Sequence, residues 1–167
     1  YTTDGTTWVT TGGTLDAANI PVGVDVTNYK DRLTVLTAAG LLRQSSGLSS
    51  PNYNSVSWTS GNRTIAIDPD NTSEAGRGVG LAKISGLLLI FKERALYTYN
   101  GSSTQADILV SVGSTSRKSI VTGGGLCTFF NPDGIWSTTG NYPILISKPV
   151  QPYIDGMASA NYDSVAG

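Results

Sequence analysis

One segment, Gly86 to Gly101, constrains the fold of this chain more than any other. It has the pattern of a β-hairpin, two short strands joined by a charged turn. The first strand, Leu87 to Phe91, is apolar at every position, which is typical of a strand buried on both faces. The second strand is aromatic and half polar. Because a doubly covered strand needs more than one layer around it, the segment predicts a multi-sheet architecture.

Two weaker copies of this hairpin lie at Tyr29 to Ser45 and at Leu126 to Thr138, the second around the strong turn sequence Asn131-Pro132-Asp133-Gly134. Counted from Leu33, Leu87 and Leu126, the hairpins begin 54 and 39 residues apart. Four-stranded propeller blades repeat at about 40 to 50 residues. The pattern therefore predicts an all-β, antiparallel fold of three to four β-propeller-like blades, an incomplete propeller. A β-sandwich is the alternative, since every antiparallel sheet contains hairpins.

The composition fits one all-β region that spans residues 1–167. Hydrophobic residues make up 39% of the chain, which is enough for a core, and Ser, Thr, Asn and Gly supply much of the polar surface. The net charge is -1, so no basic field would attract nucleic acid or an anionic membrane. The first residue is Tyr1, and we expect the chain to be a portion of a larger propeller-bearing protein. The single cysteine, Cys127, lies in an apolar run and is interpreted as a core residue.

The chemistry-bearing residues argue against an enzyme. The chain has no histidine, which excludes Ser-His-Asp and Cys-His mechanisms. Its acids lie mainly in turn sequences, such as Asp4 and Asp133, where turn formation explains them. The segment Asp68 to Glu74 lacks the glycine of a calcium loop, and Gly76 to Gly80 lacks the Lys-Ser/Thr pair of a phosphate loop and is interpreted as a flexible loop. We expect no catalytic residues, no metal and no cofactor; a propeller glycosidase would need two acids in one cleft.

Lys92, Glu93 and Arg94 form the densest charge cluster and occupy the turn of the first hairpin. Solvated charges at a sheet edge block unwanted strand pairing, which is the expected role of this cluster. A subunit interface is the alternative role, in which the same three side chains form salt bridges to another copy. They are the candidate interface residues of the chain.

The three tryptophans, Trp8, Trp58 and Trp136, allow a different function. Exposed aromatic rings can form a platform for sugars, so a carbohydrate-binding or host-receptor-binding β module is an alternative. Each tryptophan lies within a strand pattern, however, and packing is the default role of an aromatic ring there. No apolar run is long enough to cross a bilayer, and no membrane span is expected.

The segment Gly86 to Gly101 resembles a recurrent segment of virion tail proteins of tailed bacteriophages, the group that includes podovirus tail nozzle (tail tubular protein B) and head-tail junction proteins. Other segments agree in order, and the similarity covers about Tyr29 to Ile154: Asp31-Arg32-Leu33-Thr34-Val35, Val56-Ser57-Trp58-Thr59, Gly113 to Val121, and Phe129-Phe130-Asn131-Pro132-Asp133-Gly134-Ile135-Trp136.

This resemblance implies a structural protein located in the virion, in the tail or neck. It implies a β-propeller-like domain that assembles with itself as a ring, a hexamer by resemblance, and with other tail or neck proteins. Genome DNA would pass through the ring during ejection without sequence-specific binding. A nearly neutral surface suits such a conduit, because basic residues would hold the phosphate backbone.

Overall fold

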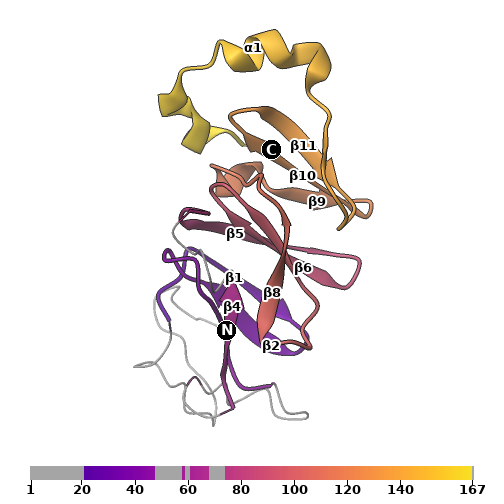
Figure 1. Ribbon diagram of the computed structural model, residues 1–167. Coiled ribbons are helices and arrows are strands. Elements are labelled where there is room, and N and C mark those ends of the chain that lie inside the picture. Colours follow the sequence, from indigo (N-terminus) through magenta and orange to yellow (C-terminus); the bar gives the residue numbers. More distant parts are fainter. Residues whose placement is uncertain (1–20, 48–57, 59–60, 68–73, 167) are drawn as a thin grey trace, which may run out of the picture.

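The computed structural model describes residues 21–47, 58, 61–67 and 74–166. These residues are mostly β, with short helices confined to the last part of the chain and to one connection (Figure 1). The prediction of an all-β fold is confirmed. Trp8 and the acids Asp4, Asp68 and Asp70 lie outside the described residues, and so do most positions of the strand expected around Trp58.

The strands follow one another as three four-stranded antiparallel meanders, in which each strand pairs with the next along the chain. The first meander contains β1 (Asp25–Tyr29), β2 (Arg32–Leu36), β3 (Leu42–Gln44) and β4 (Arg63–Ile67). The second contains β5 (Gly78–Ile84), β6 (Leu87–Lys92), β7 (Leu96–Tyr99) and β8 (Gln105–Val110). The third contains β9 (Val121–Gly123), β10 (Leu126–Asn131), β11 (Gly134–Thr138) and β12 (Ile144–Leu145).

The first two meanders join into one eight-stranded sheet in the order β1-β2-β3-β4-β8-β7-β6-β5. The joint is a short parallel pair between β4 and β8, in which Ala66 faces Gln105 and Ile67 faces Ala106. The sheet curls until its two edge strands, β1 and β5, lie beside each other without pairing. It is therefore nearly closed, and the third meander forms a separate sheet.

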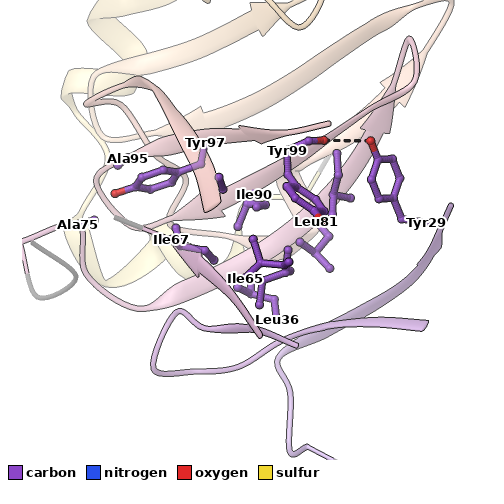
Figure 2. Packing of buried hydrophobic residues seen from close by; sticks show 13 residues of the cluster. Tyr29, Leu36, Ile65, Ile67, Ala75, Leu81, Ile90, Ala95, Tyr97 and Tyr99 are labelled. Atoms are coloured by element: carbon purple, nitrogen blue, oxygen red, sulfur yellow. Dashed lines mark hydrogen bonds between the residues drawn. The ribbon is translucent and has the colours of Figure 1, made fainter. Parts of the chain in front are cut away.

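The two meanders of the large sheet enclose a core between them, shown in Figure 2, and β6 contributes Leu88 and Ile90 to it. The opposite face of β6 contributes Leu89 and Phe91 to a second core against the third meander. There the ring of Phe91 meets that of Phe129 edge to face, with centroids 5.0 Å apart. Leu88 to Phe91 are fully buried, so the predicted double burial of this strand is confirmed.

The three predicted hairpins are confirmed, and they are the central strand pairs of the three meanders: β2 with β3, β6 with β7, and β10 with β11. The prediction of a loop at Gly76 to Gly80 is wrong for the second half of this segment. Gly78 already belongs to β5 and pairs with Lys92 of β6. A bulge between Gly78 and Gly80 interrupts the pairing and hides the strand pattern.

The C-terminal part follows the third meander and turns back over its outer side (Figure 1). It contains η3 (Lys148–Val150), α1 (Gln151–Asp155) and η4 (Ser159–Ser164), and the ring of Tyr162 in η4 packs on Phe130. A further short helix, η2 (Arg117–Ser119), connects β8 to β9.

Candidate functional site

A concave surface lies along the seam between β1 and β5, where the large sheet remains open. At one end, the Asp25 carboxylate accepts a hydrogen bond from the backbone N–H of Leu81 at 2.8 Å. The same carboxylate forms an ion pair with Arg117 of η2 at 2.5 Å. The acceptor for this backbone N–H of β5 is thus a side chain of β1 and not the backbone of β1. Because Leu81 is 56 residues from Asp25, this contact fastens two distant parts of the chain.

At the other end of the seam, the Tyr29 hydroxyl lies 2.7 Å from the carbonyl oxygen of Gly86 and 3.0 Å from that of Tyr99, to which it can donate (Figure 2). The rings of Tyr29 and Tyr99 are 5.9 Å apart and tilted. Burial raises the pKa of the Tyr29 hydroxyl, so it remains a donor at neutral pH. The two ends of β1 are therefore held to the second meander by side chains.

Between these two contacts the seam is hollow. One hollow of about 230 Å³ is lined by Thr27, Lys83 and Arg117 among others, and a neighbouring one of about 350 Å³ is lined by Lys30 and Lys83. The charged groups in these linings are cations, and apolar side chains such as Leu81 and Ile120 line the first hollow as well. Asp25 adjoins them but already holds Arg117 and the Leu81 amide. The seam can accept polar groups, but the described lining residues provide no nucleophile paired with a free base.

The candidate interface cluster differs from expectation at Lys92, whose side chain is fully buried. The expectation of a fully solvated charge cluster is wrong there, because Lys92 still belongs to β6 and points to the same side as Leu88 and Ile90. Its stem fills the space above Gly40, where a Cβ atom would lie 2.5 Å from Lys92 Cε. Because Gly40 has no side chain, there is room for the buried side chain of Lys92.

Glu93 and Arg94 behave differently from Lys92. Glu93 accepts hydrogen bonds from Arg77 Nε at 2.7 Å and from the Arg77 backbone N–H at 3.1 Å, so its observed ion pair lies within the chain. Burial opposes ionisation of the Glu93 carboxyl, but the bonds from Arg77 outweigh it and lower its pKa. Arg94 is exposed. Of the cluster, Arg94 is the residue whose exposure best suits an interface.

The backbone of this turn is held between two loops. The N–H groups of Glu93 and Arg94 donate to the carbonyl oxygens of Arg77 and Ala75, at 3.0 and 2.9 Å. On the other side, the Ser114 N–H donates to the Lys92 carbonyl oxygen at 3.0 Å, and Gly113 packs directly against the turn. The turn is therefore fixed by backbone hydrogen bonds to the loops on its two sides.

The described tryptophans lie apart. Trp58 is 4% exposed and packs with Val35 on the outer side of the first meander. Trp136 packs beside the core of the third meander, and its indole N–H donates to Asn131 Oδ1 at 2.9 Å. The structure does not bring these two rings together as a platform.

A cluster of buried serines was not predicted from the sequence. The Ser114 hydroxyl donates to the Phe130 carbonyl oxygen at 3.0 Å, and the Ser119 hydroxyl accepts the Phe130 N–H at 3.2 Å. Ser116 donates to the backbone oxygens of the C-terminal segment at Asp163 and Val165. In the sequence, this cluster shows only as serines at positions 114, 116 and 119 beside a polar connection. Because serine is common throughout the chain, these three positions do not stand out.

Cys127 is fully buried, which confirms its predicted place in the core, and burial raises the pKa of its thiol to about 12. Asp133 lies in the turn between β10 and β11, where its N–H donates to Asn131 Oδ1 at 3.0 Å. In the described part of the chain, no three His, Cys, Asp or Glu side chains gather as metal ligands would. No helix in the same part is long and apolar enough to span a membrane.

Comparison of the whole chain with protein-family models gives no match, and comparison with curated proteins gives none.

Proposed function

We propose that this chain is a structural, β-propeller-like part of a phage tail or neck protein that self-associates around a DNA conduit. The observation that carries the proposal is the position of the three predicted hairpins. Each one forms the two central strands of a four-stranded antiparallel meander. The repeat in the sequence therefore corresponds to a repeat in the strand pairing.

The packing of the meanders supports this proposal. A propeller is built from four-stranded antiparallel sheets that pack face to face. The middle meander contributes to one core through Ile90 and to the other through Phe91, so it packs on a neighbour with each face. Three meanders are fewer than a closed propeller has, and the missing ones would come from elsewhere in a longer protein or from other copies.

The chemistry of the chain supports a mechanical role better than a catalytic one. The chain lacks histidine and has a net charge of -1, and the carboxylate at the seam is engaged in holding two strands together. A conduit must let DNA pass without gripping its phosphates, and a nearly neutral surface avoids the salt-dependent attraction that basic residues create. Self-association into a ring, hexameric by resemblance, and contact with other tail or neck proteins in the virion complete the proposal.

Electron microscopy of the purified protein tests the proposal. Rings with an axial hole are the expected result, because neither a sugar-binding module nor a propeller glycosidase requires them. Isolated compact particles at every protein concentration would contradict it.

A further inference from the structure

The hollow of about 230 Å³ in the seam lies where three segments of the chain meet. Thr27 of β1, Lys83 of β5 and Arg117 of η2 all line it. Thr122 of β9 is its other polar residue, and the rest of the described lining is apolar. No carboxylate belongs to the described lining, so both of its charged side chains are cations.

The fold leaves the polar groups of this lining unused. Lys83 is exposed and forms no hydrogen bond or ion pair with the described residues. The Thr27 hydroxyl has no hydrogen-bond partner among these residues either. Arg117 donates only its Nε–H, to Asp25, so its two terminal amino groups have no acceptor in the described part of the chain. An ammonium group, a hydroxyl group and two amino groups therefore line one hollow with hydrogen bonds still to give.

The strand geometry places Thr27 opposite Lys83. Thr27 lies two residues beyond Asp25 in β1, and Lys83 lies two residues beyond Leu81 in β5. Because Asp25 accepts the Leu81 N–H and the two strands run in the same direction, Thr27 and Lys83 face each other across the seam. A ligand between the strands would meet both side chains.

Arg117 is held in place before any ligand binds. Its side chain crosses β5 above Gly80, where a Cβ atom would lie 2.5 Å from Arg117 Cδ and 3.2 Å from Arg117 Nε. Because Gly80 has no side chain, the arginine can follow this path, and the Asp25 carboxylate then holds its Nε at 2.5 Å. A cation that is fixed in this way loses little side-chain freedom on binding, which favours affinity.

The donors of this hollow suit an anion that has several oxygens. The Lys83 ammonium supplies a point charge with three donors, and the terminal amino groups of Arg117 match two oxygens of a phosphate. The Thr27 hydroxyl can donate to a third oxygen. A metal ion would be repelled by both cations, and an apolar group would leave the donors unpaired. We propose that the hollow binds a phosphate group, either as the free ion or as an ester.

The proposed site is one hollow and takes one phosphate group. The neighbouring hollow offers less, because the ammonium of its Lys30 donates to the carbonyl oxygen of Asn100. The inference goes beyond the proposed function and does not depend on it. A single phosphate site is also compatible with a nearly neutral conduit, since strong binding of DNA takes several phosphate contacts.

Titration of the isotope-labelled protein with inorganic phosphate tests the proposal, with amide NMR shifts as the readout and sodium chloride holding the ionic strength constant. Lys83→Gln removes the ammonium group from the hollow. Lys118→Gln is the matched control, because Lys118 is the exposed neighbour of Arg117 in η2 and lines neither hollow. Both variants lose one positive charge, so a general electrostatic effect would weaken binding by both equally.

We expect saturable shifts at Thr27 and Lys83 in the wild type, with a dissociation constant in the millimolar range or below. Lys83→Gln should weaken phosphate binding by about tenfold, the size expected for a charge-assisted hydrogen bond. Lys118→Gln should stay within about twofold of the wild type, because water and salt screen a charge outside the hollow. Thr27→Val keeps the shape of the side chain and should weaken binding less than Lys83→Gln, because a neutral hydroxyl forms the weaker hydrogen bond.

Shifts that do not saturate, or that chloride alone reproduces, would overturn the proposal. So would equal binding by Lys83→Gln and Lys118→Gln, which would reduce the effect to net charge. Titration with glucose 6-phosphate distinguishes the two sources of the ligand. Tighter binding than that of inorganic phosphate supports an ester, and weaker binding supports the free ion.

Discussion

Gly113 offers the sharpest test of the way the hairpin turn at Lys92 to Ala95 is held. A Cβ atom at Gly113 would lie 2.6 Å from the Glu93 carbonyl carbon, 2.7 Å from the Ala95 nitrogen and closer still to the Lys92 carbonyl oxygen, whereas ordinary contacts begin at 3.4 Å. All three neighbours are backbone atoms, so no side chain can rotate away. The Gly113→Ala variant must therefore move the loop off the turn.

The cost of Gly113→Ala has two parts. Overpacking against fixed atoms costs about 1–3 kcal/mol. Moving the loop also strains the hydrogen bond from the Ser114 N–H to the Lys92 carbonyl oxygen, which contributes about 0.5–1.5 kcal/mol. We expect a total loss of about 1.5–4.5 kcal/mol in the free energy of unfolding. Urea denaturation followed by tryptophan fluorescence measures this loss.

Gly123→Ala is the matched control, because no atom lies within 4 Å of a Cβ at this exposed position. Its free energy of unfolding should stay within about 0.5 kcal/mol of that of the wild type. Equal urea midpoints for the two alanine variants would refute the reasoning, since they would show that the loop and the turn can separate without cost.

Three other perturbations have defined outcomes. Phe91→Ala should lower the free energy of unfolding by about 3–5 kcal/mol in urea denaturation, since it empties space in the second core; a loss below 1 kcal/mol would contradict its burial. Asp25→Ala should cost about 1–3 kcal/mol in the same assay, because the Leu81 N–H loses its acceptor, and Asp25→Asn should cost less. Cys127 should not react with a thiol reagent at pH 8 until the protein unfolds. Its pKa is higher in the folded state, so its contribution to stability is complete below about pH 9 and is lost as the pH rises towards 12. Cys127→Ala should lack that part of the alkaline loss, to which Tyr29 and Tyr99 also contribute.

Local patterns in the sequence were sufficient for the hairpins and for the buried strand. The run Leu87 to Phe91 could be interpreted correctly because both of its faces are apolar, and the Asn131 to Gly134 turn because its residues favour a turn wherever they occur. The apolar neighbours of Cys127 in the sequence were sufficient to predict that it lies in the core.

Contacts between distant residues could not be predicted in this way. The pairing of β4 with β8 and the contact of Asp25 with Leu81 depend on how the meanders meet, which no local pattern encodes. The burial of Lys92 depends on a missing side chain at Gly40, 52 positions away. Reading a charged residue near a turn as solvated is a good general rule, and here a distant glycine reverses it.

The short parallel joint between β4 and β8 has a consequence for folding. Each meander is built from neighbours in sequence, whereas the joint needs residues about 40 positions apart, so loop closure delays it. We expect the meanders to form first and to dock afterwards. Once docked, the large sheet is held along one side by two residue pairs and along the other by Asp25 and Tyr29. Opening along that second side should expose the Tyr99 region to solvent before global unfolding, and amide hydrogen exchange in β1 should then be faster than in β6.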